Sequence, residues 1–177
     1  MKTVKLLSAL VIMLLFVVTF YHQKVISTLL LPQYIAWAHN IEEQGLKIGM
    51  SLNEREQQLA AEIGIKHPEK VKIVYVNEVP FPHENFALKT LGEALGFIGE
   101  GIVNNAQVFG YTIYVRKGFN LNKPKLAHEL VHVLQIERSS LDQIVTQHFS
   151  DLAQYGYSNA PLEVEAFEAN KTYSQDW

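Results

Sequence analysis

Hydrophobic and polar residues alternate along two segments of the chain, residues 70–80 and 110–118. Both segments are rich in valine, isoleucine and aromatic residues, and glycine or proline closes each of them. Alternation of this kind is typical of strands that bury one face. We therefore expect two β-strands at these positions.

Helical signals mark the segments before and between these strands. In "SLNEREQQLAAEIG", Ser51 and Glu54 have the spacing of a capping box, and Gly64 suits the position just past a helix end. Residues 86–99 have apolar residues at helical spacing, but three glycines within them weaken the expectation of a helix.

Three further helices are expected in the C-terminal third. The first covers residues 122–138 and opens with an asparagine and a proline, which suit the first helical positions. The second covers residues 139–156 between a serine cap and a glycine, and the third covers residues 159–171. The order is helix, strand, helix, strand and then three helices. It predicts an α+β fold whose helices gather toward the C-terminus.

The first 24 residues follow a different pattern. Lys2 and Lys5 precede an apolar run from Leu6 to Phe20, which is the layout of a secretory signal or a signal anchor. The residues that end the run are mostly bulky, whereas a cleavage site requires small ones. We therefore expect an uncleaved membrane anchor, with a cleaved signal peptide as the alternative.

These patterns divide the chain into three parts. Residues 1–24 are the anchor or signal peptide, residues 25–39 are a linker or membrane-proximal segment, and residues 40–177 are the folded domain. The lysines before the apolar run predict a cytoplasmic N-terminus and an extracytoplasmic domain, in the periplasm or outside the cell. If the signal is cleaved, the protein is secreted.

Composition narrows the possible partners and the chemistry. Hydrophobic residues make up 48% of the chain and charged residues 19%, which is enough apolar material for a packed core. The net charge is -3 and no long basic run is present, so we expect no nucleic-acid partner. Because the chain has no cysteine, any metal must be bound by imidazole and carboxylate groups.

Candidate chemistry lies in the stretch "KLAHELVHVLQ". His128 and His132 are four residues apart, so they project from one helix face and can bind one zinc ion. Glu129 lies about 100° around the helix from His128. It can therefore reach a water molecule near the metal without being an equivalent ligand. This is the H-E-x-x-H motif, with two ligands and a general base. The alternative is a partly exposed helix with incidental histidines.

A catalytic zinc ion usually has a third protein ligand and one open position. The metzincin extension requires glycine and histidine where this chain has Gln135 and Arg138, so that class is excluded. Asp151 is one candidate, since "SDLAQYG" is faintly similar to the aspartate segment of aspzincins. The acidic helix "PLEVEAFEAN" supplies the other candidates, Glu163, Glu165 and Glu168.

The histidine pair, followed about thirty residues later by a helix with E-x-E-A, resembles the gluzincin class of zinc metallopeptidases. In that class the third ligand is a glutamate that opens an E-x-x-x-D type segment, and the resemblance implies Glu163 for this role. The aspartate of that segment orients a histidine ligand, and Phe167 stands at its position in this chain. Glu165 or Glu168 could orient the histidine instead, and Glu165 could itself be the ligand.

Residues 110–171 carry the resemblance, which extends to small bacterial zincin-like domains of mostly unassigned function. It implies a zincin-like fold and one Zn²⁺ ion bound by His128, His132 and Glu163. It also implies hydrolysis of a peptide or protein substrate with Glu129 as general base. The alternative is a non-catalytic zincin-like binding or structural module tethered to the membrane.

The resemblance has two further implications for the site. In zincins an edge strand beside the active-site helix pairs with an extended substrate, and Tyr111–Arg116 is the candidate here. Stabilising the transition state usually requires an additional hydrogen-bond donor. Spacing does not single out any one of the available donors, which are Arg138, His148, Tyr155 and Tyr157.

Overall fold

The computed structural model describes residues 26–175 and residue 177, and it has the α+β class that the sequence predicts. Its contacts divide the chain into two units, Met1–Tyr34 and Ile35–Trp177. The described part of the first unit is the π-helix η1 (Ile26–Leu30) and the start of α2 (Leu31–Ile48). The boundary expected between residues 39 and 40 falls inside α2, and the division into anchor, linker and domain stays a prediction.

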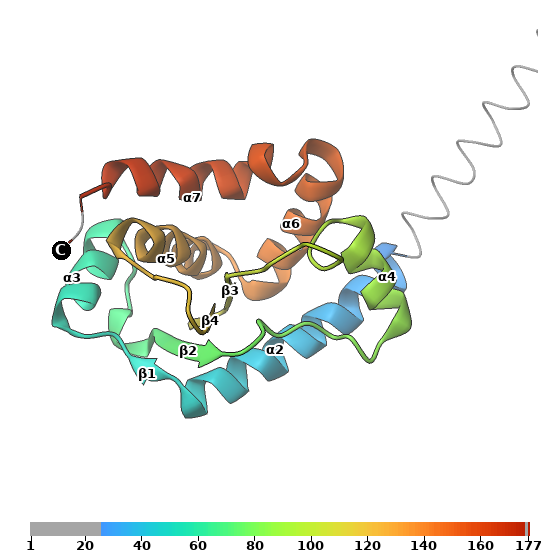
Figure 1. The fold of residues 1–177 in the computed structure, drawn as a ribbon, viewed down its shortest axis with the longest axis horizontal. Helices are drawn as coiled ribbons and strands as arrows, with labels where there is room; N and C mark the ends of the chain where they lie inside the picture. The colour runs from blue at the N-terminus through green and yellow to red at the C-terminus, as the bar shows by residue number, and fades with distance from the viewer. Residues whose placement is uncertain (1–25, 176) are drawn as a thin grey trace, which may run out of the picture. The chain divides into compact units, whose positions relative to one another are not determined.

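The second unit combines a small sheet with helices, as Figure 1 shows. Its helices after α2 are α3 (Glu54–Ile63), α4 (Phe86–Ala94), α5 (Lys123–Arg138), α6 (Leu141–Tyr155) and α7 (Pro161–Thr172). Two short 3₁₀ turns, η2 (Pro68–Lys70) and η3 (Tyr157–Asn159), lie between them. The helices expected in the C-terminal third are confirmed as α5, α6 and α7. The segment rich in glycine forms a helix only as far as Ala94.

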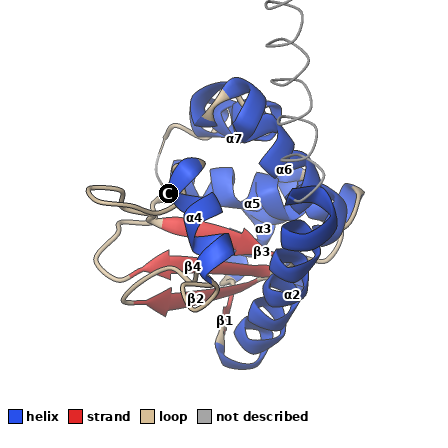
Figure 2. Cartoon of the chain, turned by 90° about the vertical axis from the view of Figure 1, so that its right-hand side faces the viewer, coloured by secondary structure: helices blue, strands red, loops and turns tan. Residues whose placement is uncertain are grey.

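The sheet has four strands in the order β1 (Met50–Ser51), β2 (Lys72–Val76), β4 (Thr112–Arg116), β3 (Ala106–Phe109). Strand β4 is parallel to β2 and antiparallel to β3, and β1 is antiparallel to β2. Both predicted strands are present, as β2 and β4, while β1 and β3 were not predicted. Figure 2 shows the four strands side by side.

This strand order corrects one expectation. The segment Tyr111–Arg116 was the candidate substrate-binding edge strand, but β4 pairs with β2 on one side and with β3 on the other. Its backbone groups are therefore used within the sheet. Among the described strands, β3 is the edge next to β4.

The free side of β3 can be identified from its hydrogen bonds to β4. Arg116 N donates to Asn105 O over 2.8 Å, so residues 105 and 116 form a hydrogen-bonded pair. Hydrogen-bonded and non-hydrogen-bonded pairs alternate along an antiparallel ladder. The backbone N–H and C=O groups of Ala106 and Val108 therefore point away from β4, toward the open edge.

A second correction concerns the cap of α3. The capping box consists of Asn53 and Glu56, not of Ser51 and Glu54: Glu56 N donates to Asn53 Oδ1 over 3.0 Å, and Asn53 N donates to Glu56 Oε2 over 2.7 Å. Ser51 belongs to β1, where its hydroxyl accepts a hydrogen bond from a lysine side chain. The predicted end of the helix at Gly64 is confirmed, with a φ of 109° that favours glycine.

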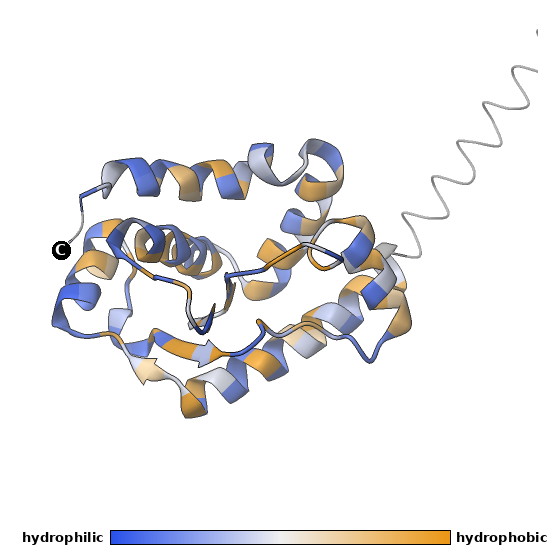
Figure 3. Cartoon of the chain, viewed as in Figure 1, coloured by the Kyte–Doolittle hydropathy of each residue, from blue (hydrophilic) through white to orange (hydrophobic). Residues whose placement is uncertain are grey.

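Helix α5 lies between the sheet and α7 (Figure 1, Figure 2). Apolar residues from α3, β2, β4, α5 and α7 form one buried cluster around it. Figure 3 shows that α5 also carries hydrophilic residues along its length. A helix in this position needs partners for its polar side chains, because an unpaired buried polar group costs free energy.

Within residues 26–175, no helix is both long enough and apolar enough to span a lipid bilayer. The predicted anchor, residues 1–24, lies outside the described part of the chain.

Candidate metal centre

Helix α5 directs two histidine side chains toward the same point. His128 and His132 are one helical turn apart, and their Nε2 atoms lie 3.2 Å from each other. His128 is buried, and the side chain of His132 is 14% exposed. Apolar neighbours in α5 pack into the core cluster and hold this helix face in place.

Helix α7 brings a carboxylate to the same point. Glu163 lies in the first turn of α7 and is only 2% exposed. One of its oxygens, Oε2, is 3.6 Å from His128 Nε2, and the other, Oε1, is 3.6 Å from His132 Nε2. Burial raises the pKa of Glu163, but the nearby imidazoles of His128, His132 and His148 outweigh this effect, so the pKa is lowered. The structure thus brings together the three residues that the sequence analysis proposed as ligands.

The spacing of these three side chains fits a divalent metal ion. Ligand atoms from all three lie within 4.8 Å of one another. Ligands of tetrahedral zinc, at about 2.0–2.1 Å from the metal, are separated by about 3.3–3.4 Å. The two histidine nitrogens are 3.2 Å apart, close to that value, and each lies 3.6 Å from a different oxygen of Glu163. In addition, Glu163 Oε2 is a buried oxygen with no hydrogen bond that satisfies normal geometry.

The other acidic residues of α7 have different partners. Glu165 accepts hydrogen bonds from Gln135 and Arg138, and Glu168 accepts one from Lys171. Neither belongs to the group of close ligand atoms. The side chains that Glu165 contacts in α5 are therefore Gln135 and Arg138, and neither is a candidate ligand.

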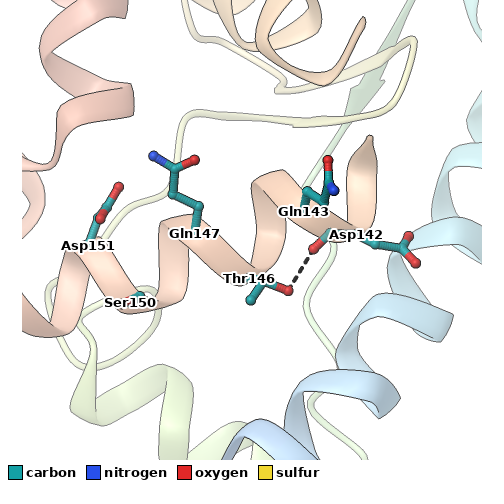
Figure 4. A pocket seen from close by; sticks show the side chains of 6 residues that line it. All are labelled: Asp142, Gln143, Thr146, Gln147, Ser150 and Asp151. Carbon is teal, nitrogen blue, oxygen red and sulfur yellow. Dashed lines mark hydrogen bonds between the residues drawn. The ribbon is translucent and has the colours of Figure 1, made fainter. Parts of the chain in front are cut away.

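Helix α6 contributes a surface hollow and a third histidine. Asp151 lies at one end of the hollow, which none of the three candidate ligands lines (Figure 4). His148 is closer to the centre, since its Nε2 lies 3.6 Å from Glu163 Oε1. Burial lowers the pKa of His148, although the charges of Glu163 and Asp151 oppose that effect. The residues lining the hollow are Asp142, Gln143, Thr146, Gln147, Ser150 and Asp151.

The proposed general base is half-buried beside this group. Loss of hydration raises the pKa of Glu129 to about 7, partly offset by His132 and reinforced by the charge of Glu163. Glu129 directly follows His128 in α5, which places it beside the candidate ligands. A carboxylate there can accept a proton near neutral pH.

A glutamine holds one of the candidate ligands. Gln135 is buried, and its Oε1 lies 2.9 Å from His132 Nδ1. Its Nε2 donates to Leu162 O over 3.0 Å and to Glu165 Oε2 over 2.9 Å. Groups that hydrogen-bond the outer nitrogen of a histidine ligand fix its orientation.

Two aromatic residues complete the surroundings. The ring of Phe167, which stands where gluzincins have aspartate, packs 5.0 Å from the ring of His128. Tyr157 packs against Phe167 with 6.0 Å between ring centroids. Burial raises the pKa of Tyr157, and the charge of Glu163 and a hydrogen bond with it raise the pKa further. The phenol therefore stays protonated and can donate a hydrogen bond.

Sequence reasoning assigned no role to Gln135, and it named His148 and Tyr157 only as two of four available hydrogen-bond donors. Gln135 was detectable, because it follows His132 by three positions and so shares its helix face. His148 and Tyr157 come from α6 and η3, and no spacing relates them to the H-E-x-x-H motif.

The chain matches no protein-family model, no curated protein and no solved structure. The resemblance to gluzincins therefore stays a prediction based on the residues quoted above.

Proposed function

We propose that the protein is a membrane-anchored, zinc-dependent metallopeptidase with a zincin-like fold. The observation that supports it is the meeting of His128 and His132 from α5 with Glu163 from α7. Two imidazoles and one carboxylate form a ligand set used by catalytic zinc sites, which leave one position open. The predicted anchor at residues 1–24 supports attachment to the membrane.

Different residues would bind the metal and transfer the proton. His128, His132 and Glu163 would hold the metal, and zinc bound there acts as a Lewis acid toward water and a carbonyl oxygen. Glu129 takes the proton of the attacking water and passes it to the leaving amine. Its proximity to His132 and Glu163 supports this role.

Strand β3 is the proposed binding site for the peptide backbone. It packs against α5, and the backbone groups of Ala106 and Val108 point to its open edge. An extended peptide that pairs there adds a strand to the sheet. The substrate is therefore an unfolded or loop segment of a peptide or protein, because a folded helix cannot pair with a strand edge.

Metal analysis and proteolysis of the purified full chain test this function. The unchanged protein should contain zinc and cleave an unfolded, fluorescently labelled protein, and a chelator should stop cleavage. Glu129→Gln should keep the zinc and lose cleavage by about 10²–10⁴-fold, since it removes only the proton acceptor. Glu163→Ala should lose the zinc. Cleavage that survives in Glu129→Gln would contradict the mechanism.

A non-catalytic zincin-like module is the second candidate. The observation that favours it is Phe167, together with the buried His128 Nδ1, which has no hydrogen-bond partner. A histidine ligand usually donates through its second nitrogen. If the protein binds zinc with normal stoichiometry but cleaves no unfolded protein, this candidate replaces the first.

A further inference from the structure

Gln135 contacts a candidate ligand from a position where its own orientation is fixed. Its side-chain nitrogen has two hydrogens, and two acceptors receive them, Leu162 O and Glu165 Oε2. Reversing the carboxamide would put its oxygen against both acceptors, which is unfavourable. The oxygen of Gln135 therefore faces His132.

This orientation determines the tautomer of His132. Oε1 of Gln135 is an acceptor, so the Nδ1 atom of His132, 2.9 Å away, must carry the hydrogen. In the neutral ring Nε2 then carries the lone pair, and it faces His128 Nε2 and Glu163 Oε1. That is the form a metal-binding imidazole needs.

The glutamine is itself held from α7. Glu165 accepts from Gln135 through Oε2 and from Arg138 through Oε1, the latter over 2.6 Å. Arg138 thus keeps the carboxylate of Glu165 turned toward Gln135. A chain of polar contacts runs from Arg138 through Glu165 and Gln135 to His132.

We propose that Gln135 is a positioning residue that fixes His132 in the Nδ1–H tautomer, with Glu165 and Arg138 holding Gln135 in place. This network does for His132 what an aspartate on the second helix does in the gluzincin pattern, where this chain has Phe167. The inference about metal affinity rests on the proposed function, whereas the tautomer is a property of the metal-free protein.

Nitrogen NMR of the metal-free full chain, purified in mild detergent with ¹⁵N-labelled histidine, tests the tautomer. The chain has seven histidines, so the signals can be separated, and loss of one signal in His132→Asn assigns it. The unchanged chain should show Nδ1–H at His132, and Gln135→Leu should move the proton toward Nε2. Gln57→Leu is the matched control, because Gln57 also donates to a backbone carbonyl but lies in α3.

Zinc titration of the same variants tests whether the contact between Gln135 and His132 increases zinc affinity. Gln135→Leu should bind zinc about 10–100-fold more weakly, as expected when the outer partner of a histidine ligand is lost. The paired change Gln135→Glu with Glu165→Gln keeps an acceptor toward His132 and a donor from residue 165, but it leaves Leu162 O without its donor. It should therefore retain the Nδ1–H tautomer and recover part of the zinc affinity.

The outcomes separate this inference from the proposed function. An Nε2–H tautomer in the unchanged chain overturns the inference. The inference is also overturned if His132 keeps the Nδ1–H tautomer in Gln135→Leu. A third contradicting result is a paired variant that folds but shows neither the Nδ1–H tautomer nor any recovery of zinc affinity. If the unchanged chain binds no zinc, the proposed function fails, and the NMR result still decides the role of Gln135.

Discussion

At the scale of single residues, Tyr157 combines an exposed side chain with contacts to the buried centre. It is 55% exposed, yet its hydroxyl interacts with Glu163 and its ring packs on Phe167. A protonated phenol at the border of a catalytic site can stabilise negative charge that develops on the substrate. Tyr155, two residues earlier, is similarly exposed and ends α6.

Tyr157→Phe is therefore expected to lower kcat by about 10²–10³-fold, the usual cost of removing one transition-state donor. KM, and the zinc content at saturating zinc, should change little, because the ring and its packing remain. Steady-state cleavage of the labelled protein measures both constants. Tyr155→Phe is the matched control and should leave them unchanged; equal effects of the two changes would refute the assigned role.

How far the site could be predicted depends on where its residues lie in the chain. His128, Glu129 and His132 occupy one helix, so helical geometry alone relates their side chains. Glu163 lies on another helix, and only the resemblance to gluzincins pointed to it. His148 and Tyr157 reach the site through the packing of α6 and η3 against α5 and α7, which no local pattern describes.

At the scale of elements, Glu137 connects the end of α5 to neighbouring segments through hydrogen bonds. Its carboxylate accepts hydrogen bonds from the backbone N–H groups of Lys66 and His67 and from the Tyr111 hydroxyl. Burial raises the pKa of Glu137, but these hydrogen bonds and the charge of His67 lower it below its usual value. The ionised form therefore stabilises the native fold.

Glu137→Gln should lower the free energy of unfolding by about 1–3 kcal/mol at pH 7. Because the folded-state pKa of Glu137 is lowered, its contribution is complete above the unfolded-state pKa of about 4.3. It is lost as the pH falls through the folded-state pKa. The difference in the free energy of unfolding between the unchanged protein and Glu137→Gln should therefore shrink below about pH 4. Urea unfolding at several pH values measures this difference.

An exposed carboxylate provides the comparison for this change. Glu43 is paired only with Lys47 on the surface of α2 among the described contacts, and such pairs contribute little. Glu43→Gln should leave unfolding nearly unchanged at every pH. A Glu137→Gln difference that stays constant between pH 7 and pH 3 would contradict the role given to the ionised carboxylate.

Helices were predicted best where only one sequence pattern indicated where the helix begins. Helix α5 was expected over residues 122–138 and runs from Lys123 to Arg138. The cap of α3 was misplaced by two residues because Ser51 and Asn53 each precede a glutamate by three positions. Helix α3 begins at Glu54, so the residue directly before it, Asn53, is the N-cap, whereas Ser51 pairs with β2.

At the scale of the whole molecule, topology decides which backbone is available to a substrate. The alternating pattern predicted β4 but could not give its neighbours, and pairing with β2 and β3 places it in the interior of the sheet. Strand β3 has four residues, too few for alternation to be recognised. Its two-residue connection through Gly110, which has a φ of 58°, places β3 beside β4, and no described strand pairs with the other side of β3.

Val108→Pro tests this edge. Proline removes a backbone N–H that points away from β4, a position where an edge strand tolerates proline. The fold and zinc content should persist, while KM for the unfolded protein should rise about tenfold through loss of a backbone hydrogen bond. Gln107→Pro is the comparison, since it removes an N–H directed at β4 and should lower the melting temperature. An unchanged KM in a folded Val108→Pro protein would exclude β3 as the substrate strand.

Zinc should also couple α5 to α7, because its proposed ligands come from both helices. Zinc at about 1,000 times its Kd is expected to stabilise the native chain by about 4 kcal/mol, and a chelator should remove this increment. Glu163→Gln separates coordination from simple ion pairing. If the carboxylate is a ligand, this change eliminates most of the zinc-dependent rise in melting temperature. It also lowers the metal-free melting temperature, because the nearby histidines stabilise the ionised carboxylate of Glu163 and lower its pKa. If Glu163 only pairs with the histidines, the metal-free protein should lose stability and zinc should still raise the melting temperature.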